Sequence, residues 1–215
     1  MMEMDKRQVE IIPAILVKSR AEFEAKVALV APFVSRVQID IMDGKFVPNK
    51  TLQPGDFPAI TSGLEAEYHL MVENPLDYVR MIGKKGAIYE LHVESVKDVG
   101  AAIEEVKKLG GRVALAISPD TPVSSVEPYL PQIEHVLVMT VYPGFSGQKY
   151  LPAMEEKMRA LSAKGAVVEV DGGIDIGTAK SAARAGATLL GVASGIFAKP
   201  DMKKAIEEMK KDAEG

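Results

Sequence analysis

The chain alternates short runs of β-branched and other apolar residues with longer stretches in which apolar residues recur every three or four positions. A short apolar run is typical of a buried strand, and the longer period is typical of an amphipathic helix. The pattern predicts strands at 10–16, 36–41, 65–70, 87–92, 112–117, 134–141, 166–170 and 188–193. It predicts helices near 20–31, 54–62, 75–85, 97–109, 122–130, 150–164, 176–186 and 200–212.

Several helix boundaries carry their own signals. Ser19 with Glu22 three residues later has the capping-box pattern, and Pro75 and Pro122 each occupy a predicted first helical position. Gly110, followed by a second glycine, is expected to end the fourth helix.

Eight strands, each followed by a helix, predict an α/β fold of the closed (β/α)₈ type, a TIM barrel. The 215 residues are near the minimum length for that barrel, and nothing like a linker divides them, so residues 1–215 are expected to form one domain. An open doubly wound sheet is the alternative, but the glycine-rich turn that would follow its first strand is missing. The barrel is therefore favoured.

Composition narrows the class of protein. The apolar share of 47% and the charged share of 26% are those of an ordinary globular protein, and a net charge of −4 gives no reason to expect nucleic acid or a membrane surface as a partner. The absence of cysteine excludes disulfides, thiolate nucleophiles and cysteine-ligated metals. Neither a signal peptide nor an apolar run of membrane-spanning length is visible, so a cytoplasmic enzyme or binding protein is expected.

Ionisable residues at the ends of the predicted strands are the first candidates for chemistry. Asp40 ends the second strand, His69 the third and Asp171 the seventh. Barrel enzymes keep their catalytic groups at the carboxyl ends of the strands, so we expect these three side chains to converge. Two carboxylates and an imidazole suit either a divalent metal or acid/base catalysis, and both interpretations stay open.

Other polar residues have structural explanations of at least equal weight. His92 ends the fourth strand and can be either catalytic or a packing residue behind the site. His135 lies near the start of its strand, the stability end of a barrel, and is interpreted as structural. Asp43, next to Gly44, is equally well explained as a turn residue.

Three loops rich in small residues follow the last three predicted strands, at 142–148, 172–173 and 193–195. Phosphate sites in (β/α)₈ barrels use backbone N–H groups of such loops, because glycine lets the backbone approach an anion closely. These loops predict a phosphate site on that side of the barrel mouth.

Four segments together resemble the ribulose-phosphate 3-epimerase family over nearly the whole chain: 40–49, 69–75, 143–149 and 169–174. The resemblance implies a (β/α)₈ barrel that interconverts ribulose 5-phosphate and xylulose 5-phosphate. It makes Asp40 and Asp171 the two acid/base groups, acting on opposite faces of C3. It also implies a divalent metal (Zn, Fe, Mn or Mg) bound by Asp40, His69 and Asp171, and a homo-oligomer. The substrate and its phosphate are expected to contact His69, Met42, Met71, Met139, Gly144, Phe145, Ser146, Gly147, Gly172, Gly173, Ala193 and Ser194.

The chain departs from the family pattern at the metal site. Gln38 stands where the family has a histidine ligand. A neutral amide oxygen is a poor ligand for zinc or iron beside an imidazole, but it is acceptable to Mn²⁺ or Mg²⁺. Gln38 is therefore expected to be a fourth ligand only for an ion that accepts an amide oxygen, such as Mn²⁺ or Mg²⁺.

Further departures lie on the same rim. Ala14 and Val17 replace two family serines, Tyr142 replaces an asparagine and is expected to add bulk, and Ser146 and Ala193 replace glycines. These changes keep two alternatives open. One is an enzyme for another ketose phosphate, including a six-carbon one, or a related decarboxylase or aldolase. The other is a catalytically weak phosphosugar-binding barrel.

Overall fold

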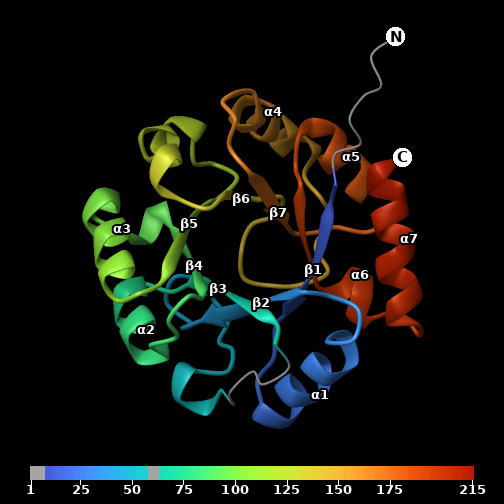
Figure 1. Cartoon of the computed structure of the whole chain (residues 1–215), viewed down its shortest axis with the longest axis horizontal. Coiled ribbons are helices and arrows are strands. Elements are labelled where there is room, and N and C mark those ends of the chain that lie inside the picture. Colours follow the sequence, from blue (N-terminus) through green and yellow to red (C-terminus); the bar gives the residue numbers. More distant parts are fainter. Residues whose placement is uncertain (1–7, 58–62) are drawn as a thin grey trace.

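Eight parallel strands form a closed barrel in the computed structural model, which describes residues 8–57 and 63–215. Each strand pairs with the next along the chain, and β1 pairs with β8 to close the ring (Figure 1). The barrel prediction is thereby confirmed, and the open sheet is excluded. The strands are β1 (Glu10–Ile15), β2 (Arg36–Met42), β3 (Glu65–Met71), β4 (Ile88–His92), β5 (Arg112–Ile117), β6 (Val136–Met139), β7 (Val168–Asp171) and β8 (Leu189–Val192).

Helices surround the barrel on the outside (Figure 1). The α-helices are α1 (Arg20–Val30), α2 (Pro75–Ile82), α3 (Val99–Lys108), α4 (Glu155–Ala163), α5 (Thr178–Ala185), α6 (Ser194–Phe197) and α7 (Met202–Glu214). Short 3₁₀ helices are η1 (Pro54–Asp56), η2 (Val93–Ser95), η3 (Val123–Ser125), η4 (Glu127–Gln132) and η5 (Pro152–Met154). No helix in the described ranges is long and apolar enough to cross a membrane.

Most of the boundary signals are confirmed. The Ser19 hydroxyl accepts a hydrogen bond from the backbone N–H of Glu22, and Pro75 is the first residue of α2. Gly110 follows α3 with a φ of 85°, a left-handed conformation that glycine adopts without strain.

The predictions for the second and fifth helices are wrong in part. Residues 122–130 do not form one α-helix but contribute to η3 and η4, and Pro122 precedes η3 instead of starting a helix. Pro128 and Pro131 lack the N–H that an α-helix needs, which explains the short 3₁₀ turns. Only η1 lies in the described part of 54–62, and residues 58–62 lie outside it. The short helix α6 was not predicted.

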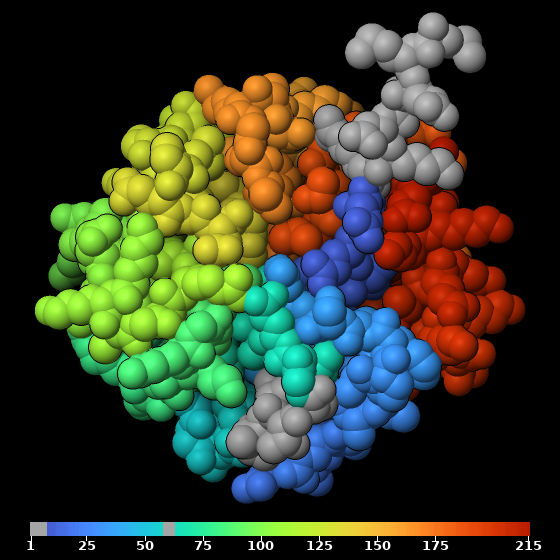
Figure 2. Space-filling model, in the orientation of Figure 1, coloured from blue at the N-terminus to red at the C-terminus, as the bar shows by residue number. Residues whose placement is uncertain are grey.

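The barrel interior contains an unusual number of buried polar side chains. Most barrel interiors are filled with branched apolar residues, but here Gln38, Glu67, His69, Glu90, His92, His135 and Glu169 are all at most 2% exposed. Because strand side chains alternate, residues two positions apart share the inward face. The inward residues therefore form an upper layer (Asp40, His69, His92 and Asp171) and, two residues nearer the strand starts, a lower layer (Glu67, Glu90, Glu169 and, just before β6, His135). Figure 2 shows distant parts of the chain meeting around the barrel centre.

Candidate active site

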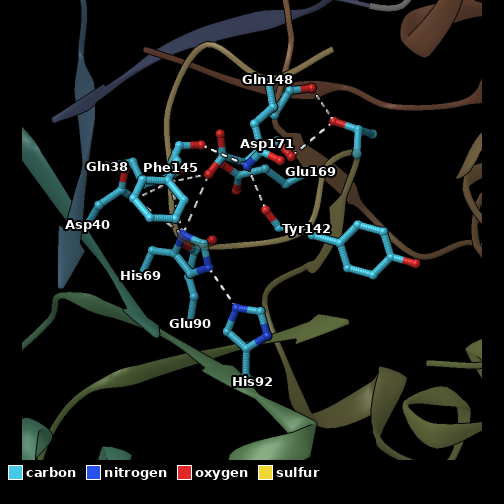
Figure 3. A network of polar contacts seen from close by, with 12 residues as sticks. Gln38, Asp40, His69, Glu90, His92, Tyr142, Phe145, Gln148, Glu169 and Asp171 are labelled. Atoms are coloured by element: carbon cyan, nitrogen blue, oxygen red, sulfur yellow. Dashed lines mark hydrogen bonds and ion pairs between the residues drawn. The ribbon is translucent and has the colours of Figure 1, made fainter. Parts of the chain in front are cut away.

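The three predicted strand-end residues do converge. Asp40, His69 and Asp171 project from β2, β3 and β7 toward one another at the mouth of the barrel (Figure 3). The Nδ1 atom of His69 is 3.2 Å from Oδ1 of Asp40 and 3.6 Å from Oδ2 of Asp171. Strand register explains the meeting, because Asp40 pairs directly with His69 across β2 and β3.

Gln38 occupies the centre of this group. Its Nε2 donates hydrogen bonds to Asp40 Oδ1 at 2.8 Å and to Asp171 Oδ2 at 3.0 Å, and lies 3.2 Å from His69 Nδ1. The other end of the amide, Oε1, is buried and accepts no hydrogen bond from residues 8–57 or 63–215. A Cβ at Gly191 would lie 2.7 Å from this oxygen, so the glycine provides the space for the amide.

A chain of hydrogen bonds continues from His69 away from the acids. His69 Nε2 is 2.9 Å from His92 Nε2, and His92 Nδ1 is 3.1 Å from Glu94 Oε2. Glu94 also accepts hydrogen bonds from the Ser118 N–H at 2.8 Å and from the Thr121 hydroxyl. The carboxylate of Glu94 fixes the proton of His92 on Nδ1, so His92 Nε2 accepts a hydrogen bond from the N–H group at His69 Nε2. His92 therefore orients His69 and does not line the pocket.

Electrostatics at the mouth follow from this arrangement. Burial disfavours the charged imidazole of His69, but hydrogen bonds with Asp171 and Asp40 raise its pKa to about 10. Burial and the neighbouring charge of Asp40 raise the pKa of Asp171 above its ordinary value, although His69 and Gln38 oppose that rise. The imidazolium thus holds together two carboxylates that would otherwise repel each other.

The same atoms can hold a divalent cation. Asp40, His69 and Asp171 each offer one ligand atom, and these atoms lie within 4.8 Å of one another. With Nε2 of His69 bonded to His92, the Nδ1 lone pair of a neutral ring is free for a metal. Rotating the Gln38 side-chain amide by a half-turn exchanges the positions of Nε2 and Oε1. Oε1, which accepts no hydrogen bond from the described residues, would then face the cation. The donor set fits a metal ion.

The pocket above the acids contains nearly all of the predicted substrate contacts. Its apolar wall includes Met42, Met71 and Met139, as predicted, together with Leu16 and Val141. The predicted loop residues that line it are Gly144, Phe145, Ser146, Gly147, Gly172, Gly173, Ala193 and Ser194. Gln38 and His69 lie beneath this wall. The lining residues that were missed are Leu16, Val141, Pro143, Gln148, Ile174 and Gly191, of which Pro143, Gln148 and Ile174 stand inside recognised motifs.

The loop 142–148 is fixed over the pocket by side-chain amides. Gln148 Nε2 donates to the carbonyl oxygens of Tyr142 at 2.7 Å and Phe145 at 2.9 Å, and Asn49 Nδ2 donates to that of Gly144 at 2.8 Å. The expectation that Tyr142 adds bulk to the sugar site is wrong. Its hydroxyl donates to Asp120 at 3.0 Å, and its ring points away from the acids (Figure 3).

Two glycines after β7 are required by the backbone itself. Gly172 and Gly173 have φ values of 119° and 67°, and a Cβ at either would lie 2.4 Å from an atom of Val141 or Tyr150, respectively. Within the described residues, the backbone N–H groups of Gly147, Gly173 and Ser194 donate to no acceptor. Such N–H groups at a pocket rim are suited to bind an anion.

Two threonines that sequence reasoning missed fix the strand ends. The Thr51 hydroxyl donates to the carbonyl oxygen of Asp40 at 2.8 Å, and the Thr140 hydroxyl donates to that of Asp171 at 2.9 Å. Neither residue belongs to a motif with a chemical signature, so only the fold identifies them. The turn interpretation of Asp43 is confirmed, because its carboxylate accepts hydrogen bonds from the backbone N–H groups of Lys45, Phe46 and Glu73.

Comparison with known proteins agrees with this geometry. The model of the Ribulose-phosphate 3 epimerase family matches residues 10–197. Ribulose-phosphate 3-epimerase of Methanocaldococcus jannaschii is 40% identical over 185 residues, which cover 81% of this chain and 78% of that protein. The cytoplasmic isoform from Oryza sativa subsp. japonica is 40% identical over 188 residues, covering 83% and 82%.

Solved structures with the same fold are more distant in sequence. The crystal structure of 3-hexulose-6-phosphate synthase from Salmonella typhimurium superposes with a TM-score of 0.70 at 17% identity, covering 95% of this chain and 98% of that one. Orotidine 5'-phosphate decarboxylase from Pyrococcus horikoshii gives a TM-score of 0.64 at 18% identity, covering 95% and 99%. At such identities the likeness concerns the fold alone. The family match and the close relatives show that the chain belongs to the ribulose-phosphate 3-epimerase family.

Proposed function

We propose that this chain interconverts ribulose 5-phosphate and xylulose 5-phosphate by moving a proton between Asp40, Asp171 and C3 of the sugar. The observation that carries the proposal is the placement of the two acids. They come from β2 and β7, share one amide donor, Gln38, and both line the floor of a pocket whose rim has free backbone N–H groups.

Each carboxylate serves one face of the substrate. One of them removes the C3 proton, which leaves an enediolate, and the other returns a proton to the opposite face. The raised pKa of Asp171 suits it to hold the proton that is returned, while Asp40 acts as the base in that direction. In the reverse direction the two roles exchange.

The negative charge of the enediolate needs a positive partner. A divalent cation bound by Asp40, His69 and Asp171 would supply Lewis-acid stabilisation of the developing oxyanion. The chain's own contribution is to hold the two acids in place through the Gln38 amide and through His69, itself oriented by His92. Met42, Met71 and Met139 keep water away from the reacting carbons.

Different parts of the mouth would bind the phosphate and the sugar of the substrate. The free N–H groups of Gly147, Gly173 and Ser194 would bind the phosphate. Phe145, a residue of the pocket lining that is 54% exposed, would cover the bound sugar.

The test is a coupled assay for xylulose 5-phosphate with the variants Asp40→Asn and Asp171→Asn. Each should lose at least about 10²-fold in kcat and keep the fold. Either variant is also expected to exchange solvent deuterium into only one epimer. Asp175→Asn is the matched control, because this carboxylate lies in the same loop after β7 but pairs with Lys199 outside the pocket. Near-normal turnover by either Asn variant would contradict the two-base mechanism, and faster turnover of a six-carbon ketose phosphate by the wild type would contradict the substrate.

A further inference from the structure

The lower layer is a second cluster of ionisable side chains to which the proposed reaction assigns no role. Glu67, Glu90 and Glu169 lie two residues before His69, His92 and Asp171 on the same inward faces of β3, β4 and β7. Two residues of a strand span about 6.6 Å, so this cluster is separate from the site at the mouth. His135 joins it from the position before β6, and all four residues are at most 2% exposed.

Two positive groups reach these three carboxylates. His135 Nε2 lies 2.8 Å from Glu90 Oε1 and also 2.8 Å from Glu169 Oε2, and Arg36 Nη1 donates to Glu67 Oε1 at 2.5 Å. An imidazole nitrogen carries a single proton, so it cannot donate fully to both carboxylates.

Several oxygen atoms of the cluster are left without a donor. Among the described residues, Oε2 of Glu67, Oε2 of Glu90 and Oε1 of Glu169 are buried and accept no hydrogen bond, and Oε2 of Glu169 has only the ion pair with His135. A buried carboxylate oxygen without a donor is strongly unfavourable, and here three such oxygens come from three side chains. The cluster as it stands therefore has too few positive partners for three ionised acids.

We propose that Glu67, His135 and Glu169 form a binding site for a divalent transition-metal ion in the barrel interior, with Glu90 as a further oxygen ligand. One ligand atom from each of the first three residues lies within 4.8 Å of the others. Carboxylate oxygens with one imidazole nitrogen suit Mn²⁺, Fe²⁺ or Zn²⁺. On binding, the Nε2 proton of His135 and any proton held by the carboxyl groups of Glu67, Glu90 and Glu169 leave to solvent, and the freed nitrogen and oxygen lone pairs become the ligands.

The ion would act on the fold and not on the substrate. It would link β3, β7 and the start of β6 from inside the barrel, and it would neutralise the acids that His135 and Arg36 satisfy only in part. Because every ligand is sealed from solvent, the ion must enter while the chain folds or opens.

The experiment separates this site from the one at the mouth. The double variant Asp40→Asn/Asp171→Asn removes both carboxylate ligands at the mouth and leaves the lower layer intact. The full chain is unfolded with guanidinium and chelator, refolded with Mn²⁺, Zn²⁺ or Fe²⁺, freed of excess metal and analysed for metal content and thermal midpoint. One ion per chain and a higher midpoint after refolding with metal are expected.

A triple variant that adds Glu169→Gln should lose the ion and the metal-dependent rise in midpoint. Metal below about a tenth of an ion per chain in the folded double variant, or an equal content in the triple variant, would overturn the proposal. If the triple variant does not fold, anomalous diffraction decides, from crystals of wild-type protein that has been refolded in the presence of Mn²⁺. A peak between Glu67, His135 and Glu169 supports the site, and a water molecule or no peak there overturns it.

Discussion

The upper and lower layers of the barrel contain the same kinds of side chain, but they differ in access to solvent and in hydrogen bonding. Asp40 and Asp171 line a pocket, and both accept hydrogen bonds from Gln38. The glutamates of the lower layer are fully buried, and several of their oxygens have no donor in the part of the chain that the structure describes. Burial and the nearby charge of Glu169 raise the pKa of Glu67 to about 9 and that of Glu90 to about 7.

Because of this difference, we expect the upper layer to affect catalysis and the lower layer to affect the stability of the fold. Groups at the mouth can exchange protons with a substrate, and they can be rehydrated when a partner is removed. Groups in the lower layer are sealed from bulk solvent, so they are satisfied by one another, by holding a proton or by a bound cation. Variants in the upper layer should therefore lose mainly activity, and variants in the lower layer should lose mainly stability.

The largest effect on stability is expected for His135→Ala. It leaves Glu90 and Glu169 buried without their shared positive partner, and breaking a buried ion pair in this way costs about 3–5 kcal/mol. Urea unfolding measures the loss. Glu134→Gln is the control, since this neighbouring carboxylate is 44% exposed and should change the free energy of unfolding by less than about 1 kcal/mol. Equal stabilities of the two variants would contradict the role of His135 as the positive partner of the buried acids.

His69→Gln should damage catalysis more than folding. The change removes the positive charge between the two acids, so the pKa of Asp171 rises further and less of the ionised base is present at neutral pH. We expect kcat/KM to fall by about 10²-fold and the acidic limb of its pH profile to move to higher pH. A pH profile of unchanged shape would contradict this electrostatic role.

Gln38→His tests the mouth as a metal site. The imidazole would replace an amide that now presents N–H groups to the acids, and metal affinity should tighten by about tenfold or more. Competition with a coloured chelator measures the affinity, and the Glu169→Gln background prevents binding in the lower layer. Gln38→Asn is a matched amide control with a shorter reach. Unchanged affinity in the histidine variant would mean that position 38 does not face the ion.

Glu94→Gln is expected to have the smallest effect, and the effect depends on pH. Although burial opposes the shift, bonds to His92, Thr121 and Ser118 lower the pKa of Glu94 to about 2. A lowered pKa means that the ionised group stabilises the fold above its unfolded-state pKa, about 4.3, and that this contribution is lost as the pH falls toward 2. The wild type should therefore be the more stable protein at pH 7, and the gap should close near pH 2. A gap that is the same at both pH values would exclude this linkage.

The sequence was sufficient for the fold and for most of the pocket. All eight strands were located because short apolar runs stand out between amphipathic stretches, and Asp40, His69 and Asp171 were identified because parallel strands bring their carboxyl ends to one edge. The predicted helix at 122–130 failed because prolines overrode the periodic pattern.

Only the tertiary structure decided how these residues are paired. The central position of the Gln38 amide, the bond between His69 and His92, and the outward turn of Tyr142 depend on contacts between strands and loops far apart in the chain. The lower layer was also invisible in sequence, where Glu67, Glu90 and Glu169 look like the polar half of alternating strands. Closing the barrel turns that half inward, so these side chains meet at its centre as a sealed set of acids.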